Sequence, residues 1–248
     1  MRYFFSAASR SVAARLAGQN TLCAFDYDGT LAPIVADPAR ARMRLRTRRL
    51  LAALAAVYPC IVISGRARRE VAERLSGLGL ARIIGNHGAE TETPAAARPE
   101  VGKWLSALRP LVAALEGVWV ENKGCSLAVH YRQSIHKREA RRRILAAAQE
   151  LKSARVVGGK QVINLLPAGA PDKGTALLSE RERLGSDWVL YVGDDENDED
   201  AFALDTNVVA VRIGRKPNSR ASYYLRKQLE IDRLLDLMVV LRRTSPPA

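Results

Sequence analysis

The sequence predicts an α/β fold, in which a doubly wound parallel sheet is interrupted by a smaller α+β unit. The first observation is a set of short apolar runs that each end in a polar cluster, as buried parallel strands do. They are Thr21–Phe25, Cys60–Ile63 and Trp188–Val192. The second is that helical stretches alternate with these runs. The third is that the middle of the chain has a different order of predicted helices and strands. At 248 residues the chain has room for one core and one inserted unit.

Helices are expected around these runs because apolar residues recur there at helical spacing. The first twenty residues are expected to form an amphipathic helix and not a cleaved signal, since Arg10 and Arg15 interrupt their apolar patch. Lys173 stands at an expected helix start, directly after Pro171-Asp172. The other core helices are expected at about Thr47–Val57, Glu70–Leu78 and Arg233–Leu241.

The middle of the chain runs helix, hairpin, helix, hairpin, which predicts a duplicated α+β unit. The expected helices are Val101–Leu115 and the strongly basic His136–Lys152. The expected hairpins are Val118–Glu121 with Ser126–Tyr131 around Asn122-Lys123-Gly124, and Val156–Val157 with Gln161–Leu165 around Gly158-Gly159. The predicted domains are therefore residues 1–87 and 171–248 for the core, and 88–170 for the inserted unit.

The charge of the chain bears on its binding partners, and its cysteines bear on its cellular compartment. The formal net charge is +13, but the segment Arg40–Arg49 contains no aromatic residue, which disfavours nucleic-acid binding. The ordinary interpretation of this basic segment is a solvated helix face. A further interpretation of the net positive charge is that it attracts anionic phosphate esters. Cys23, Cys60 and Cys125 lack the spacing of a metal site or a disulfide framework, so a reducing cytoplasm is expected. No apolar stretch approaches the roughly 20 residues of a membrane span.

The strongest chemical signal is Asp26-Tyr27-Asp28-Gly29-Thr30, directly after a buried strand. Two carboxylates beyond a strand end can converge on one cation, and hard oxygen ligands suit Mg²⁺. Asp26 could then attack phosphorus as a nucleophile, while Asp28 acts as general acid and base. The alternative is a purely structural Asx-turn or helix cap.

Further polar residues follow the other predicted strands. Ser64 can hydrogen-bond a phosphoryl oxygen, and Lys173 can place its ammonium on the transferring group. Asp194, Asp195 and Asp198 crowd one loop, which costs repulsion unless a cation compensates it. Because ligands bind at the carboxyl ends of parallel strands, these groups are expected to meet there.

In this order the residues resemble the four motifs of the haloacid-dehalogenase superfamily of phosphotransferases. The matching segments are Asp26–Thr30, Ser64-Gly65-Arg66, Lys173-Gly174 and Gly193–Glu199. More narrowly, DYDGTLAPI, SGR, GNHGAE, ENKGCSLAVHYR and YVGDDENDEDAF are similar to trehalose-6-phosphate phosphatases, from about Thr21 to Phe202. The resemblance implies a Rossmann-like core with an inserted α+β cap, a Mg²⁺ cofactor, and hydrolysis of trehalose 6-phosphate, a small phosphorylated sugar. We expect no membrane or nucleic-acid partner, and a monomer or weak homo-oligomer.

The resemblance also implies roles for individual residues. The metal ligands would be Asp26, the main-chain carbonyl of Asp28, and one of Asp194 and Asp195. Glu121 and Lys123 match positions at which the family's cap grips sugar hydroxyls. Further candidate substrate contacts are Arg66, Asn86, His87, Arg132, Lys160, Asn164 and Glu199. The alternative for each is a solvated or hydrogen-bonded loop residue.

One departure from the family pattern bears on the substrate. Asn164 stands where the family usually has a Glu, so a charged acceptor for sugar hydroxyls is missing. Charge-assisted hydrogen bonds are worth about 1.5–3 kcal/mol against about 1 for neutral ones. Three hypotheses follow: a trehalose-6-phosphate phosphatase, a related phosphatase of another phosphorylated sugar or glycoside, and an inactive basic binding module. Retention of Asp26, Asp28, Lys173 and the acidic loop disfavours the third.

Overall fold

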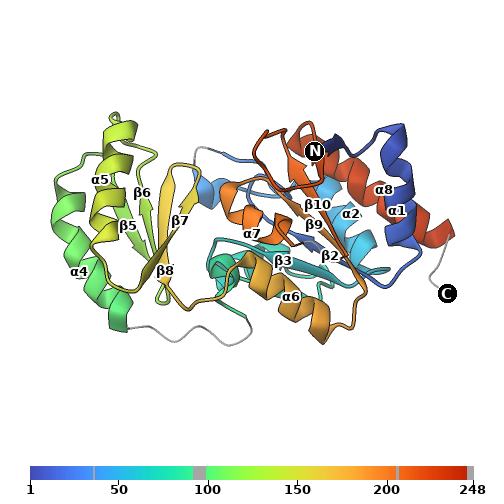
Figure 1. Ribbon diagram of the computed structural model, residues 1–248, viewed down its shortest axis with the longest axis horizontal. Coiled ribbons are helices and arrows are strands. Elements are labelled where there is room, and N and C mark those ends of the chain that lie inside the picture. The colour runs from blue at the N-terminus through green and yellow to red at the C-terminus, as the bar shows by residue number, and fades with distance from the viewer. Residues whose placement is uncertain (36, 92–98, 205–206, 245–248) are drawn as a thin grey trace. The chain divides into compact units, whose positions relative to one another are not determined.

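The computed structural model describes residues 1–35, 37–91, 99–204 and 207–244 (Figure 1). The chain divides into two compact units, Met1–Glu92 with Pro171–Ala248, and Thr93–Ala170. We call them the core unit and the inserted unit, since the second lies within the sequence of the first. None of the described helices is both long enough and apolar enough to cross a membrane.

The core unit is built on a seven-stranded sheet in which every strand pair is parallel. The strand order is β1-β11-β10-β9-β2-β3-β4. The bounds are β1 Arg2–Tyr3, β2 Thr21–Phe25, β3 Cys60–Ile63, β4 Arg82–Ile84, β9 Trp188–Gly193, β10 Val208–Ile213 and β11 Tyr223–Leu225. The three predicted strands are present as β2, β3 and β9, at the centre of the sheet.

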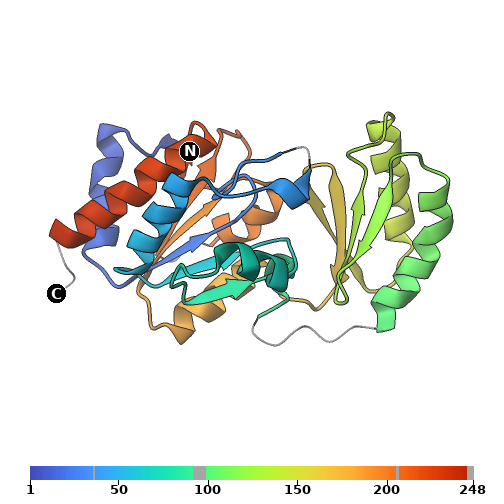
Figure 2. The same cartoon turned by 180° about the vertical axis from the view of Figure 1, so that it is seen from behind.

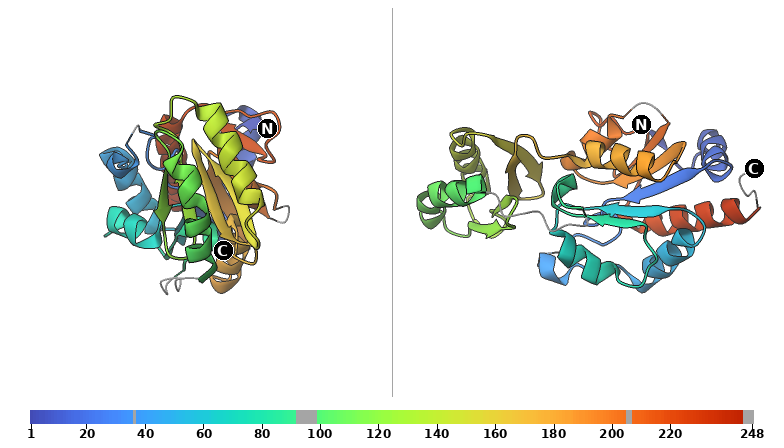
Figure 3. Two further views of the ribbon diagram at one scale, coloured as in Figure 1. Left: turned by 90° about the vertical axis from the view of Figure 1, so that its left-hand side faces the viewer. Right: turned by 90° about the horizontal axis from the view of Figure 1, so that it is seen from below.

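Helices cover both faces of this sheet, which confirms the expected α/β class (Figures 2 and 3). They are α1 Arg10–Ala17, α2 Leu45–Ala55, α3 Arg68–Leu75, α6 Lys173–Arg183, α7 Glu199–Phe202 and α8 Ile231–Thr244. Alternate residues of β2 enter two different cores, as a strand buried on both faces requires. Cys23 and Phe25 pack with α1, α2, α3 and α8, whereas Leu22 and Ala24 pack with α6 and α7.

The inserted unit is built on a four-stranded antiparallel sheet with the strand order β5-β6-β8-β7. Its elements are α4 Pro99–Ala113, β5 Trp119–Asn122, β6 Leu127–His130, α5 Lys137–Gln149, β7 Ala154–Gly159 and β8 Val162–Pro167. Its own apolar core joins α4 and α5 to one face of the sheet, with Trp104 and Ile144 packed on Val129 and Leu165. The predicted helix–hairpin–helix–hairpin order is therefore confirmed.

One turn and several helix ends differ from the sequence expectation. Gly158 and Gly159 were expected to form the second hairpin turn, but they belong to β7. The turn falls at Lys160 and Gln161, and Gln161 adopts the left-handed conformation at φ +65°. In the core, α3 ends at Leu75, before the expected Leu78, because Ser76 leaves the helical conformation at ψ 136° and Gly77 follows at φ +77°.

Register brings the polar strand ends to one edge of the core sheet. Phe25, the last residue of β2, lies opposite Val62 of β3 and Val192 of β9. The backbone N–H of Asp26 still donates to the carbonyl of Val192, at 2.9 Å. The residues that follow β2, β3 and β9 therefore emerge side by side.

Candidate active site

Lys173 joins two distant carboxylates at this edge. It is the first residue of α6, whose start is fixed by the Asp172 side chain accepting from the N–H of Thr175 at 2.7 Å. Its Nζ donates to Asp26 Oδ1 and to Asp198 Oδ1, both at 2.7 Å. Lys173 is only 1% exposed, so this ion pair lies in a region from which water is largely excluded.

Asp198 is fully buried and heavily hydrogen-bonded. Besides Lys173, its donors are the Tyr191 hydroxyl at 2.7 Å and the N–H groups of Asp194 and Asp195 at 2.8 and 2.9 Å. Burial alone would raise the pKa of Asp198, but the charge and hydrogen bond of Lys173, with these other donors, hold it below its usual range. Asp198 is therefore an ionised anchor for the loop after β9.

A glycine lets Asp194 approach Asp26. Gly29 has φ +91°, and a Cβ built on it would lie 2.0 Å from Asp194 Oδ2. The side chain of Asp194 therefore rests directly on the Gly29 backbone, where any other residue would displace it. Among the described residues, Asp26, Asp194 and Asp198 are buried and offer carboxylate oxygens within 4.8 Å of one another.

Lys173 offsets part of the negative charge of these three carboxylates. Burial raises the pKa of Asp26 well above its usual value; Lys173 opposes this, while Asp198 and Asp194 add to it. Lys173 contacts Asp26 and Asp198, and the charges of these three residues and Asp194 sum to about −2 if all four are ionised. Grouped hard oxygen ligands with that net charge fit a divalent cation such as Mg²⁺.

Asp195 lies at the edge of this group. Its side chain caps the short helix Glu196–Asp198 by accepting from the N–H of Asp198, so its carboxylate is used within the loop. Of the two neighbouring aspartates, Asp194 is the one that joins the buried carboxylate group. Two adjacent aspartates cannot be distinguished as metal ligands from the sequence alone.

Asp28 is held by an arginine. Arg66 Nε and Nη2 donate to the two carboxylate oxygens of Asp28 at 2.5 and 2.8 Å, and Nη1 contacts Glu70. Burial would lower the pKa of Arg66, but the hydrogen bonds and charges of Asp28 and Glu70 raise it instead. Arg66 was expected to contact the substrate; in this structure it positions the Asp28 carboxylate.

Ser64, Asn86 and His87 meet behind the site. Ser64 is 1% exposed, and its Oγ accepts from the N–H of Arg66 at 3.2 Å. Asn86 and His87 form a left-handed turn with φ of 47° and 58°, and Asn86 Nδ2 donates to Glu90 at 2.8 Å. The His87 ring covers Gly65, where an added Cβ would lie 2.5 Å from Cε1. All three predicted residues are buried, and the N–H of His87, after β4, donates to the carbonyl of Ser64, after β3, at 2.9 Å.

Two functional neighbours escaped the sequence prediction. Tyr191 supports Asp198 from inside β9. Arg212, on β10, donates to Glu199 at 3.0 Å, and Glu199 also accepts from the N–H of Arg220 at 2.8 Å. Glu199 was expected to contact the substrate, yet it is engaged within the core unit. A charged residue inside the apolar run of β10 is a signal that could have identified Arg212.

The inserted unit presents a second group of predicted residues. Cross-strand pairing aligns Glu121, Ala128, Asn164 and Val157 on the sheet face away from α4 and α5. Asn164 Nδ2 donates to the Val157 carbonyl at 3.4 Å.

His130 was not predicted as part of this face. Its Nε2 lies 3.0 Å from Glu121 Oε2, and its ring stacks on Trp119 with centroids 4.0 Å apart.

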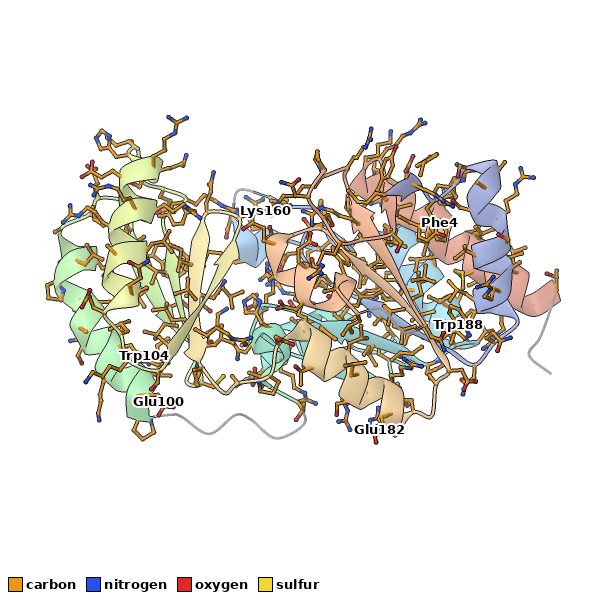
Figure 4. All side chains as sticks on the ribbon, in the orientation of Figure 1. Phe4, Glu100, Trp104, Lys160, Glu182 and Trp188 are labelled. Atoms are coloured by element: carbon orange, nitrogen blue, oxygen red, sulfur yellow. The ribbon has the colours of Figure 1, made fainter. Side chains whose placement is uncertain are left out.

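The remaining predicted residues of this unit lie in its turns. Lys123 belongs to the β5–β6 turn, where its N–H donates to Ser126 at 3.0 Å. Lys160 lies at the β7–β8 turn (Figure 4), and its carbonyl accepts from Arg132 Nη2 at 3.2 Å.

Comparison with known proteins identifies relatives of the whole arrangement. The family model described as trehalose-phosphatase matches residues 24–226. A trehalose-phosphate phosphatase of Mycolicibacterium paratuberculosis is 38% identical over 204 residues, covering 75% of this chain and 52% of that protein. Probable trehalose-phosphate phosphatase 3 of Oryza sativa subsp. japonica is 30% identical, covering 94% of this chain and 73% of that protein. The chain thus spans about half the length of the mycobacterial relative.

Solved structures agree on the fold. The C-terminal domain of the Candida albicans trehalose-6-phosphate phosphatase superposes with a TM-score of 0.78 at 22% identity, covering 93% of this chain and 96% of that one. A trehalose-6-phosphate phosphatase related protein gives 0.72 at 23% identity, with 90% and 99% covered. With the family model spanning most of the sequence, including the loops that carry Asp26, Lys173 and Asp194, the chain belongs to the trehalose-phosphatase family.

Proposed function

We propose that this chain is a Mg²⁺-dependent phosphomonoesterase that hydrolyses trehalose 6-phosphate through an aspartyl-phosphate at Asp26. The observation that carries the proposal is the buried ion pair in which Lys173 contacts both Asp26 and Asp198, beside Asp194. The names of the relatives point to the same substrate. The three free cysteines support a reducing, cytoplasmic location.

The first step uses Asp26 and Asp28. A carboxylate oxygen of Asp26 attacks phosphorus, and the bond from phosphorus to the sugar oxygen breaks. Asp28 gives its proton to the departing oxygen, so the sugar leaves as a neutral alcohol. Lys173 already donates to Asp26 Oδ1 and would also stabilise the negative charge on the transferring group.

The second step regenerates Asp26. Asp28, now ionised, takes a proton from water as the water oxygen attacks phosphorus; the bond from phosphorus to the Asp26 oxygen breaks, and inorganic phosphate leaves. The side chains of Asp26 and Asp194, with the Asp28 carbonyl, would hold the metal. When bound, Mg²⁺ neutralises these carboxylates and polarises the phosphoryl oxygens.

The inserted unit is assigned the role of a cap that selects the sugar. Glu121 and Asn164 share one sheet face, and Glu121 is oriented by His130 at 3.0 Å. Carboxylate and amide groups on one face suit a molecule that presents several hydroxyls. Lys123, Arg132 and Lys160 are further candidates in the turns of this unit.

Asn164 favours a second candidate function, the hydrolysis of another phosphorylated sugar or glycoside. The amide replaces the family's charged acceptor, and its Nδ2 points to the Val157 carbonyl. A weaker acceptor at this position relaxes the demand for a particular hydroxyl. The chemistry at Asp26 is the same for either substrate.

Phosphate release from trehalose 6-phosphate, glucose 6-phosphate and a phosphorylated glycoside tests both candidates. We expect the highest kcat/KM with trehalose 6-phosphate, reversible loss with a chelator, and no turnover by Asp26→Asn. Asn164→Glu is expected to raise kcat/KM for trehalose 6-phosphate by a few-fold, as a charge-assisted bond replaces a neutral one. Preference for the monosaccharide would favour the second candidate, and turnover by Asp26→Asn would exclude the covalent route.

A further inference from the structure

The loop after β9 is held from two opposite sides. On one side, Asp198 Oδ2 accepts from the N–H groups of Asp194 and Asp195. On the other, Arg212 Nη2 donates to the Asp194 carbonyl at 2.6 Å and Nη1 donates to the Asp195 carbonyl at 2.9 Å. Both the N–H and the C=O of each aspartate therefore have fixed partners, which fixes the direction of the Asp194 side chain.

Arg212 itself has little freedom. It is 6% exposed and lies on β10, opposite Gly193 of β9. Glu199 accepts from Nη1 at 3.0 Å and is fixed in turn by the N–H of Arg220. A guanidinium bonds two carbonyls and a carboxylate at once because its donors form a rigid planar fork, which a lysine cannot reproduce.

We propose that Arg212 is a positioning residue for the metal site: it orients Asp194 toward Asp26 and thereby sets the affinity for the divalent cation. The inference rests on the proposed function, since it assumes that Asp194 is a metal ligand. Residues that orient a ligand through hydrogen bonds typically change metal affinity by about 10- to 100-fold when mutated. Arg212 is assigned no contact with the substrate or the reacting atoms.

The chain offers a matched control in Arg242. This arginine is also buried, at 8% exposed, and donates to backbone carbonyls, those of Ala17 and Gln19 at 2.8 and 2.9 Å. It joins α8 to the loop before β2, whereas Arg212 holds the loop after β9. Arg242→Met therefore removes a comparable set of contacts without touching the Asp194 loop.

The test is Mn²⁺ binding to the substrate-free protein, measured by calorimetry and by electron paramagnetic resonance. We expect Arg212→Met to weaken binding by about 10- to 100-fold, Arg212→Lys to fall between it and wild type, and Arg242→Met to remain within about twofold of wild type. In steady state, the Mg²⁺ concentration for half-maximal activity should rise in the Arg212 variants, while kcat at saturating Mg²⁺ changes much less.

Thermal melts show whether each variant is folded at the assay temperature. If Arg212→Met does not fold, Arg212→Lys carries the test, and its wild-type Mn²⁺ affinity would overturn the proposal. Equal weakening in Arg212→Met and Arg242→Met would also overturn it, because the effect would then be general destabilisation. A wild-type protein that binds no Mn²⁺ would instead contradict the metal assignment on which the inference rests.

Discussion

Replacing Lys173 by methionine tests the charge balance of the site most directly. Each of its two contacts is 2.7 Å long. At an effective dielectric constant of about 20, one such contact corresponds to roughly 6 kcal/mol of gross attraction. Most of this offsets the desolvation of the charges, and breaking a buried pair typically costs about 3–5 kcal/mol. We expect Lys173→Met to lose stability in this range near neutral pH.

The stability of Lys173→Met should also depend on pH in a direction that follows from the pKa shifts. In the wild type the raised pKa of Lys173 and the lowered pKa of Asp198 keep that pair charged between their ordinary values of 10.5 and 3.8, so the contribution of that pair is constant there. The raised pKa of Asp26 already makes wild-type stability fall as pH increases, so the variant is compared with the wild type at each pH. In Lys173→Met the buried Asp26 and Asp198 lose their cation, so their folded pKa values rise. The folded variant then binds extra protons, and its stability falls as pH increases.

Urea denaturation at about pH 5 and about pH 8 measures this difference. The free energy of unfolding of Lys173→Met should fall below that of the wild type by a larger amount at the higher pH. Added Mg²⁺ should reduce this difference by binding the folded state. Lys103→Met, at an exposed position on α4, serves as the control and should change little at either pH. A Lys173→Met deficit below about 1 kcal/mol and independent of pH would refute the reasoning.

Two further substitutions test single contacts. Gly29→Ala places a methyl group 2.0 Å from a carboxylate oxygen, so it should abolish Mn²⁺ binding, whereas Gly77→Ala, at φ +77° with nothing within 4 Å, should cost only roughly 1 kcal/mol of backbone strain. Retained Mn²⁺ binding in Gly29→Ala would contradict the close approach. Arg66→Met should lower kcat by about tenfold or more with KM changed less, because the Asp28 carboxylate loses the partner that orients it. Arg74→Met, which removes only the contact with Glu70 and neighbouring carbonyls, is the comparison, and equal kcat values would reject the positioning role.

The central strands were predictable because each is an uninterrupted apolar run buried on both sides. The edge strands were not. β1 and β11 are two and three residues long, and β4 contains Arg82, so neither length nor composition distinguishes them from loops. β10 carries Arg212 in its apolar run. Their pairing depends on neighbours supplied by distant parts of the chain, which a local pattern does not contain.

At the site, residue types were predictable but partners were not. The sequence marks Asp26, Lys173 and the acidic loop, because such groups at strand ends meet at one edge of a parallel sheet. It does not reveal that Arg66 holds Asp28 or that Arg212 holds Glu199, since the first contact joins two loops 38 residues apart and the second joins α7 to β10, and neither is contained in a local pattern. Asp194 and Asp195 are chemically identical neighbours, and only the turn geometry of Glu196–Asp198 distinguishes their surroundings.

The net charge of the whole chain and the local charge of the carboxylates at the sheet edge would act on a phosphate ester at different distances and with opposite sign. A net charge of +13 attracts an anion from solution, within the roughly 10 Å over which salt leaves the field effective. Under the proposed function, the ester meets at the sheet edge the buried carboxylates of Asp26, Asp194 and Asp198, which repel it at contact although Lys173 contacts Asp26 and Asp198. Under the proposed function a divalent cation reverses that local sign. Because the repulsion is strongest where the dielectric constant is lowest, productive binding of the phosphoryl group requires the cation to be in place first.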